Sequence, residues 1–268
     1  MKKVILQFLV FVLLFMTGWG LFSLVDWKSH MNREVRGDQL EEKLGSIIRE
    51  AVQAREDVVI DNEILGPVDS LLTHICKKNE IDRDRIQLVI IDRDEINAFA
   101  LPGGHLGIFT GLIKEAENEA ELAGVLAHEV AHISLNHVMD KMIKELGFSV
   151  LVSIATGNAT GETIGSAIRI ITSNAYSRSL EEEADQYAAE YLISANINPE
   201  SYSEFLYRMS RNKSELPEQL KWLETHPDPE ARAMHILELI PDNEKAYHSV
   251  LGQKTWENLQ NRIKNSTD

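Results

Sequence analysis

The sequence predicts an α+β domain that is mostly helical and contains one small β-sheet. Short segments rich in β-branched and aromatic residues lie between residues 85 and 113, which is the pattern of strands. On either side of them, apolar residues recur with the spacing of amphipathic helices. The sequence contains no internal repeat and no low-complexity segment, so residues 39–268 are expected to form one continuous domain.

Two helices are expected before the sheet. The segments EEKLGSIIREAV (residues 41–52) and PVDSLLTHICKKN (residues 67–79) have apolar residues at helical spacing. The second contains Cys76, the only cysteine of the sequence. A disulfide within the chain is therefore excluded, and a buried thiol is the expected state of this residue.

The strands are expected next. RIQLVIID (residues 85–92) and EINAFALP (residues 95–102) are short and rich in strand-forming residues. The glycines of the Pro102–Gly104 turn lead the second of them into HLGIFTGLI, residues 105–113. Almost everything after residue 112 is helical in pattern.

The segment ENEAELAGVLAHEVAHISLNHVMDKMIKEL (residues 117–146) begins like a long helix. Asn118 is followed three residues later by Glu121, which resembles a capping box with Asn at the cap position. This places the HEVAH sequence of residues 128–132 well inside a helix.

The spacing of HEVAH is that of a metal site. On a helix, His128 and His132 lie about 40° apart, one turn above the other, so their imidazoles can converge on one ion. Neutral histidine nitrogen is a preferred zinc ligand. Glu129 lies about 100° further round, where its carboxylate can act as the base toward a water activated by the metal. From the motif alone, two histidines that merely share a helix face remain the alternative.

His137 lies about 140° from His132 on the same helical wheel. One helix therefore cannot present all three histidines to one metal. Two interpretations of His137 stay open: a residue that supports a ligand from behind, or a surface or packing histidine.

A catalytic zinc needs a third protein ligand. The helical segment SRSLEEEADQYAAEYL (residues 177–192) contains three consecutive glutamates, which are typical of a solvated acidic face. However, Glu181 and Asp185 share a face with Ala184 and Ala188, whose small side chains permit close helix packing. Glu181 is then a candidate ligand, and Asp185 a candidate acceptor that orients a ligand imidazole.

The N-terminal segment predicts a membrane anchor. Residues 4–25 contain no charged residue, and as a helix they would span about 33 Å, enough for a hydrocarbon core of about 30 Å. A cleaved signal peptide is the alternative. Lys2 and Lys3 favour an N-terminus on the inner side and an exported body. We therefore expect an anchor or signal at residues 1–27 and a polar linker at residues 28–38.

The net charge of −15 argues against nucleic acid as a partner, because a polyanion would be repelled. The apolar run GFSVLVSIATG (residues 147–157) is too short to cross a bilayer. A core or lid helix is expected there, with membrane contact as the alternative.

Five segments occur in an order that resembles one enzyme family between about residue 40 and residue 240. They are EKLG, NAFALPGGHLGIFTGLI, AELAGVLAHEVAHISLNH, YSRSLEEEADQYA and THPDPEAR. The sequence is similar to the gluzincin zinc metallopeptidases that include HtpX, periplasmic BepA-like proteins and the CaaX prenyl endoproteases. The resemblance implies a zincin-type peptidase domain at residues 39–268 that binds one Zn²⁺ through His128, His132 and Glu181.

The same resemblance assigns further residues. Asp185 would be the acid behind the ligands, and residues 97–100 (Asn97, Ala98, Phe99 and Ala100) would form an edge strand that borders the cleft and pairs with extended substrate. An ordinary edge strand is the alternative. His226 matches a histidine that stabilises the oxyanion or occupies the open position of the zinc, and both roles stay open.

The expected function is that of a zinc endopeptidase acting on extended, misfolded or misassembled polypeptides, with Glu129 as the general base and His226 assisting. A largely latent, zinc-stabilised protein that binds unfolded chains is the alternative. The resemblance implies an anchored peptidase in a bacterial periplasm or cell envelope, or a soluble periplasmic protein if the N-terminal segment is cleaved. The sequence predicts neither the oligomeric state nor the natural substrate.

Overall fold

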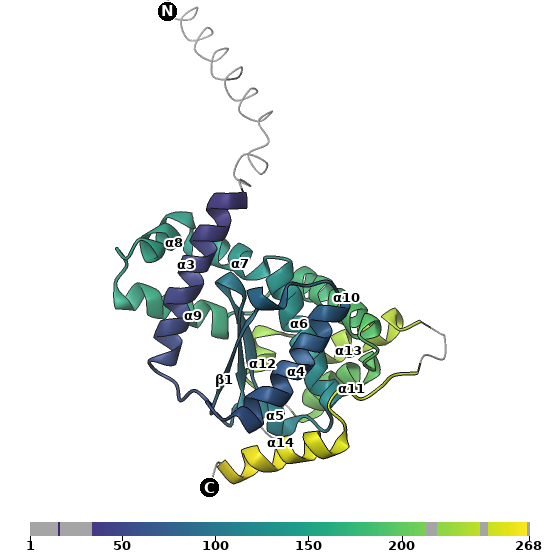
Figure 1. Cartoon of the computed structure of the whole chain (residues 1–268). Coiled ribbons are helices and arrows are strands. Elements are labelled where there is room, and N and C mark those ends of the chain that lie inside the picture. Colours follow the sequence, from purple (N-terminus) through teal and green to yellow (C-terminus); the bar gives the residue numbers. More distant parts are fainter. Residues whose placement is uncertain (1–15, 17–33, 213–218, 242–245, 267–268) are drawn as a thin grey trace, which may run out of the picture. The chain divides into compact units, whose positions relative to one another are not determined.

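The computed structural model describes residue 16 and residues 34–212, 219–241 and 246–266 (Figure 1). The expected anchor lies outside the described residues except for Met16, and the expected linker is described only from Glu34 onward. In these described parts, no helix has both the length and the apolar character that a membrane span requires. The chain divides into residues 1–39 and residues 40–268, and the fold below is that of the second part.

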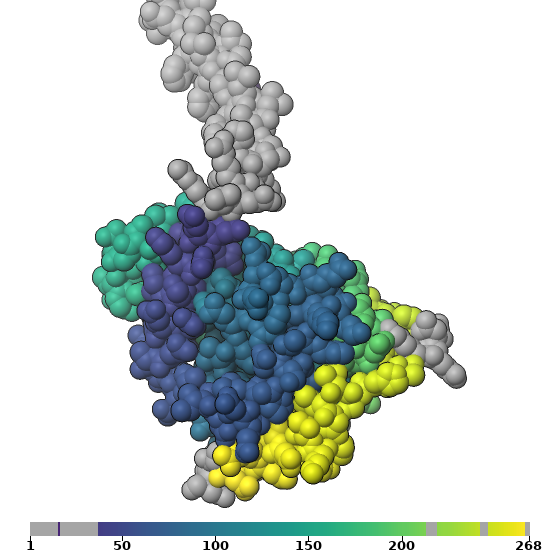
Figure 2. All heavy atoms as spheres, in the orientation of Figure 1, coloured from purple at the N-terminus to yellow at the C-terminus, as the bar shows by residue number. Residues whose placement is uncertain are grey.

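Helices dominate the described chain, as expected. Their bounds are α3 Glu34–Gln53, α4 Asn62–Lys78, α5 Thr110–Glu115, α6 Glu119–Ser134, α7 His137–Leu146, α8 Phe148–Ala155, α9 Gly161–Ser173, α10 Arg178–Ser194, α11 Pro199–Asn212, α12 Trp222–Thr225, α13 Pro229–Leu239 and α14 Gln253–Ser266. The C-terminal helix α14 packs against α4, at the lower edge of the view in Figure 2.

The sheet has three strands: β1 (Gln87–Ile91), β2 (Ala98–Leu101) and β3 (His105–Phe109). Their order is β1-β3-β2, with β1 parallel and β2 antiparallel to β3. The central strand is therefore β3, and β2 is an edge strand, as expected for residues 97–100. The predominantly helical α+β class with a small sheet is confirmed.

Two of the expected elements end earlier than their sequence pattern suggests. The strand expected at residues 105–113 stops at Phe109, and helix α5 begins at Thr110. Here the backbone leaves the sheet. The N–H of Gly111 donates to the Arg93 carbonyl, and the loop of residue 94 lies so close that a β-carbon at Gly111 would collide with the Asp94 carbonyl. The long helix expected at residues 117–146 is broken at Asn136, whose φ of 58° lies in the left-handed region.

Two hydrophobic clusters cover the two faces of the sheet. One cluster joins the sheet to α4, α6, α10, α11, α13 and α14, and the other joins it to α3, α7, α8 and α9. In the second cluster, Leu151 and Ile154 of α8 are buried, so the segment 147–157 contributes to the core as expected. Helix α6 lies against the first face and is buried along nearly its whole length.

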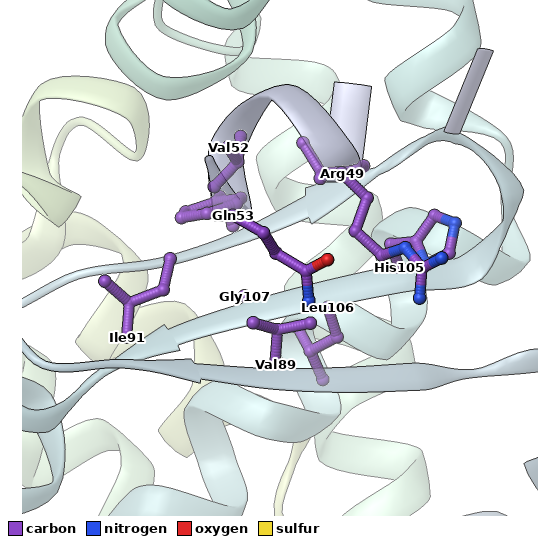
Figure 3. Close-up of a pocket in the computed structure, with 10 residues that line it drawn as sticks. Arg49, Val52, Gln53, Val89, Ile91, His105, Leu106 and Gly107 are labelled. Atoms are coloured by element: carbon purple, nitrogen blue, oxygen red, sulfur yellow. The ribbon is translucent and has the colours of Figure 1, made fainter. Parts of the chain in front are cut away.

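A small cavity lies between α3 and the sheet (Figure 3). Arg49 and His105 stand at one end of it, and Val52 and Ile91 line it further along. Its volume of about 10 Å³ is that of a single water molecule at most. The cavity is therefore a packing feature and not a binding site.

Candidate metal centre and active site

Helix α6 presents both motif histidines to the interior. The Asn118 side chain caps the helix by accepting the backbone N–H groups of Ala120 and Glu121, as the sequence predicts. One turn apart on the buried face, His128 and His132 bring their Nε2 atoms to 3.0 Å from each other. Two ring nitrogens directed at one point indicate a common ligand.

Helix α10 supplies the carboxylate. Oε1 of Glu181 lies 3.4 Å from Nε2 of His132, and Oε2 lies 3.6 Å from Nε2 of His128. Glu181 is buried, whereas the neighbouring Glu182 and Glu183 are exposed. The three glutamates are thus not one solvated face: the first points inward, next to the buried Ala184 that lets α10 approach α6.

His226 completes the cluster from the end of α12. Its Nδ1 atom lies 3.2 Å from Nε2 of His128 and 2.9 Å from Oε1 of Glu181. Two hydrogen bonds fix the backbone at His226. Its own N–H donates to the carbonyl of Trp222, and the carbonyl of the preceding Thr225 accepts the N–H of Tyr176. All four residues of the cluster are at most 1% exposed.

The cluster has the dimensions and chemistry of a zinc site. One ligand atom from each of His128, His132, Glu181 and His226 lies within 4.8 Å of the other three. Zinc bonds of about 2.0–2.1 Å in tetrahedral geometry place neighbouring ligand atoms about 3.3 Å apart. Five of the six donor pairs lie 2.9 to 3.6 Å apart, and all lie within 4.8 Å. Three imidazoles and one carboxylate therefore fit Zn²⁺ in donor type and in spacing.

Glu129 lies beside the cluster and is equally buried. Its Oε1 atom accepts the indole N–H of Trp222 at 3.1 Å and lies 3.3 Å from Nε2 of His226. Burial raises the pKa of this carboxyl, but the opposing effects of His226 and the two α6 histidines are larger and lower it to about 2. Glu129 is thus a carboxylate, the form that accepts a proton.

Asp185 lies behind His128, on the side of the ring that faces away from the cluster. Its Oδ1 atom is 3.0 Å from Nδ1 of His128, the ring nitrogen that faces away from the cluster. Burial raises the pKa of Asp185, but the Arg232 guanidinium and His128 lower it well below its usual range. The carboxylate therefore holds the imidazole with its Nε2 atom directed toward the other donors.

Arg232 was not identified from the sequence, although it ends the THPDPEAR segment. Its Nε and Nη2 atoms each donate to Asp185 at 2.7 Å, and Nη2 also donates to the Tyr202 hydroxyl at 2.8 Å. Nη1 lies 2.8 Å from Oε2 of Glu181 as an ion pair, without the N–H direction of a hydrogen bond. One buried cation thus neutralises two buried carboxylates.

Tyr176 and Lys141 pack against the His132 side of the cluster, and the sequence did not predict either of them there. The Tyr176 ring stacks on the His132 ring with centroids 4.1 Å apart. Nζ of Lys141 lies 3.9 Å from the centre of the Tyr176 ring and donates to the Ile171 carbonyl at the end of α9. Burial lowers the pKa of Lys141 to about 8, although Glu129 and Glu181 oppose this effect.

His137 lies outside the ligand cluster but touches it. The break at Asn136 turns His137 back, so that its Nδ1 atom lies 3.0 Å from Nδ1 of His132. Its Nε2 atom lies 3.4 Å from Oε2 of Glu183. Of the two open interpretations, this geometry favours the residue that supports a ligand from behind.

The edge strand β2 has backbone groups that face away from β3. The Phe109 N–H donates to the Asn97 carbonyl, so the backbone groups of Asn97 and Phe99 point toward β3 and those of Ile96 and Ala98 point outward. At Ile96 these outward groups pair with the segment before His226, through Gln219 and Trp222. The edge is thus used for strand-like pairing by the protein itself.

A groove of about 210 Å³ lies across one end of the sheet, where residues of all three strands (Ile91, Phe99 and Phe109) line it. Val52 of α3, Thr172 and Ser173 at the end of α9, and Glu224 of α12 line it as well. Within the groove lining, the buried Oδ1 atom of Asn97 has no hydrogen-bond partner. Ala98 and Ala100 are themselves buried, so the edge is covered in this conformation.

A helix with the H-E-x-x-H motif, a glutamate from a second helix and a small sheet whose edge strand lies next to them define a gluzincin, a class of zinc metallopeptidase. Residues 66–240 match peptidase family M48, and the chain belongs to that family. The recognition made from the sequence motifs is confirmed.

Several curated relatives match part of the chain. Metalloendopeptidase OMA1, mitochondrial, of Bos taurus is 33% identical over 169 residues, which are 57% of this chain and 32% of that protein. A putative beta-barrel assembly-enhancing protease of Vibrio cholerae is 31% identical over 188 residues, 65% of this chain and 39% of the relative. The beta-barrel assembly-enhancing protease of Yersinia pestis is 27% identical over 207 residues, 70% of this chain and 41% of the relative. The chain thus spans less than half the length of these relatives.

Proposed function

We propose that this protein is a zinc endopeptidase that cleaves extended polypeptides. The observation that supports this most strongly is the buried group of His128, His132 and Glu181 with Glu129 beside it. A structural zinc site needs four ligands and no base, whereas this group has a carboxylate placed to act on the substrate water. Membership of a metallopeptidase family agrees with this assignment.

The roles of the residues follow from their positions. Zinc, when bound, supplies Lewis acidity to the scissile carbonyl and to the attacking water. Glu129 accepts the proton of that water and transfers it to the leaving amine. Asp185 fixes the orientation of His128, and Arg232 keeps the two buried carboxylates neutralised while the site is formed.

Substrate recognition is proposed to use the β2 edge. Ala98 and Ala100 direct backbone groups outward, which is the arrangement that accepts an added strand. Pairing through the backbone demands an extended segment but little in its sequence, which agrees with misfolded or misassembled proteins as substrates. Two of the relatives carry the words "beta-barrel assembly-enhancing protease" in their names. Residues 97–100 therefore remain the proposed substrate strand.

The proposed location is the outer face of a membrane, with residues 1–27 as the anchor and the peptidase domain exported to the periplasm or cell envelope. A cleaved N-terminal segment, giving a soluble periplasmic protein, is the alternative. The uncharged run at residues 4–25 and the two lysines before it support the anchored form.

A second candidate is a latent form of the same site. His226 occupies the position next to the three ligands where the substrate carbonyl and water would lie, and it also contacts Glu129. In this form the protein would hold unfolded chains without cleaving them. Binding of reduced, carboxymethylated protein that survives zinc chelation, with no cleavage in zinc, would favour this candidate over the first.

The decisive experiment compares Glu129→Gln with the unchanged protein. The variant keeps the shape of the side chain but cannot accept a proton, so we expect normal zinc content and a loss of casein cleavage of about 10²–10⁴-fold. Glu145→Gln, which changes an exposed glutamate on α7, is the matched control and should cleave normally. A Glu129→Gln protein with full zinc and unchanged cleavage would refute the mechanism.

A further inference from the structure

The two motif histidines of α6 are supported differently on the side that faces away from the ligand cluster. Nδ1 of His128 lies 3.0 Å from the buried Asp185 carboxylate, which is a common partner for a metal-binding imidazole. Nδ1 of His132 instead lies 3.0 Å from Nδ1 of His137, a second imidazole. A neutral imidazole carries no charge, so it is a weaker hydrogen-bond acceptor than a carboxylate. The support behind His132 therefore depends on how the His137 ring is held.

A carboxylate stands behind this second imidazole as well. Oε2 of Glu183 on α10 lies 3.4 Å from Nε2 of His137, the ring nitrogen that does not contact His132. The His137 side chain is 3% exposed, whereas the Glu183 side chain is 50% exposed and reaches the ring from the surface. Glu183, His137 and His132 thus form a continuous chain of polar contacts from solvent to the ligand cluster.

The protons along this chain have one consistent arrangement when zinc is bound. A neutral imidazole carries one proton, so a His132 that binds zinc through Nε2 carries its proton on Nδ1. That N–H can only donate to Nδ1 of His137, whose own proton is then on Nε2, on the side of Glu183. A negative carboxylate stabilises the N–H that faces it. Glu183 therefore favours the one neutral form of His137 that accepts the hydrogen bond from His132.

Ring stacking alone does not select the orientation of His132. The Tyr176 ring lies against the His132 ring with centroids 4.1 Å apart and planes 22° apart, so it restricts the plane of the imidazole. A half-turn of the imidazole about its Cβ–Cγ bond keeps that plane but exchanges its nitrogens with carbons. The flipped ring would direct Cε1 at the other ligands in place of Nε2. A directional hydrogen bond at Nδ1 distinguishes the two orientations.

We propose that Glu183 is a positioning residue for the proposed zinc ligand His132 and that it acts through His137. This inference rests on the zinc site proposed above. Helix α10 then supports both motif histidines from behind. Asp185 does so directly at His128, and Glu183 does so through one intervening ring. Because Glu183 is half-exposed, its carboxylate can be replaced without disturbing the core.

The test compares Glu183→Leu with Glu182→Leu in the full-length protein in detergent. Both substitutions remove one charge and the same side-chain acceptors from exposed, adjacent positions of α10, so their general effects are matched. Competition with a fluorescent chelator measures the zinc affinity. We expect Glu183→Leu to weaken zinc binding by about tenfold, the lower end of the range for groups behind a metal ligand, and Glu182→Leu to leave it unchanged. Glu183→Gln restores a neutral acceptor and should recover part of the affinity.

Nitrogen NMR of ¹⁵N-histidine in the zinc-loaded protein gives a readout that a merely structural role would not change. The signals of His137 are assigned with His137→Gln. We expect a neutral His137 with its proton on Nε2 in the unchanged protein and in Glu182→Leu. In Glu183→Leu the preference for this form should weaken, because the carboxylate that stabilises the Nε2 proton is gone.

Equal zinc affinities in Glu183→Leu and Glu182→Leu, with one zinc per chain in the unchanged protein, would overturn the role of Glu183 but leave the zinc site standing. A proton on Nδ1 of His137 in the zinc-loaded protein would also overturn it, because that nitrogen could not then accept a hydrogen bond from His132. Unchanged protein that binds no zinc would overturn this inference and the zinc site together.

Discussion

The carboxylate of Glu129 faces Nε2 of His226 across 3.3 Å, while the other nitrogen of the same ring lies among the proposed zinc ligands. One imidazole thus engages both the base and the metal group. Since the site residues are at most 1% exposed, an extended polypeptide reaches Glu129 only after neighbouring elements move. The conformation described here is a closed one.

His226→Ala is expected to increase the basal cleavage of unfolded casein. The substitution removes the imidazole that would compete with substrate for the zinc, and it frees Glu129 from its contact with that ring. The zinc content, measured by metal analysis, should stay at one per chain. His235→Ala, which removes a histidine outside the cluster, is the control. Loss of cleavage with zinc intact would show that His226 serves the oxyanion instead.

Glu181→Gln is expected to weaken zinc binding by more than about 100-fold, because groups behind a ligand already contribute 10–100-fold. Glu182→Gln changes an exposed neighbour in the same run and should leave the affinity unchanged. Competition with a fluorescent chelator measures both. Equal zinc affinities in the two variants would exclude Glu181 as a ligand.

Arg232→Met is expected to destabilise the metal-free protein by about 3–5 kcal/mol, because it leaves buried carboxylates without their cation. Denaturant unfolding measures the loss. Adding Asp185→Asn removes one of those carboxylates, so the double variant should recover part of the stability. Additive losses from the two substitutions would show that the pair does not act as a unit.

The lowered pKa of His105 predicts that the fold loses stability in acid, whether or not a metal is bound. Burial, and then the nearby Arg49, lower the pKa of His105 to about 4, below its value of about 6.5 in the unfolded chain. Between these two values the unfolded chain binds the extra proton, so stability falls as the pH falls from 6.5 to 4. His105→Gln should reduce the slope of unfolding free energy against pH by about 1.4 kcal/mol per unit in this window. An unchanged slope, measured with chelator present, would show that the pKa of His105 is the same in the fold as in the unfolded chain.

Local patterns predicted the elements that carry the site. The capping signal at Asn118 and the four-residue spacing of His128 and His132 are properties of one helix, so the sequence was sufficient for both. Glu181 was a candidate ligand from its shared face with Asp185, Ala184 and Ala188, and the family resemblance then assigned it that role among three consecutive glutamates.

The rest of the site depends on long-range packing. Arg232 lies 47 positions from its partner Asp185, and no short-range spacing marks it as a buried cation. The break at Asn136 also escaped the helical pattern, since a polar residue at that position is compatible with continuing helix. That break is what brings His137 against His132. The pairing of β1 with β3 is likewise a choice between strands that resemble each other in sequence.

The pairing of Ile96 with Gln219 and Trp222 fixes a starting point on the β2 edge. A substrate strand that adds to Ala98 and Ala100 would begin where the protein's own segment stops. Each of its residues would then take a set position along the edge relative to Glu129. The bond that is cut would be chosen by its distance from the point where pairing begins, and the side chains around it would matter less.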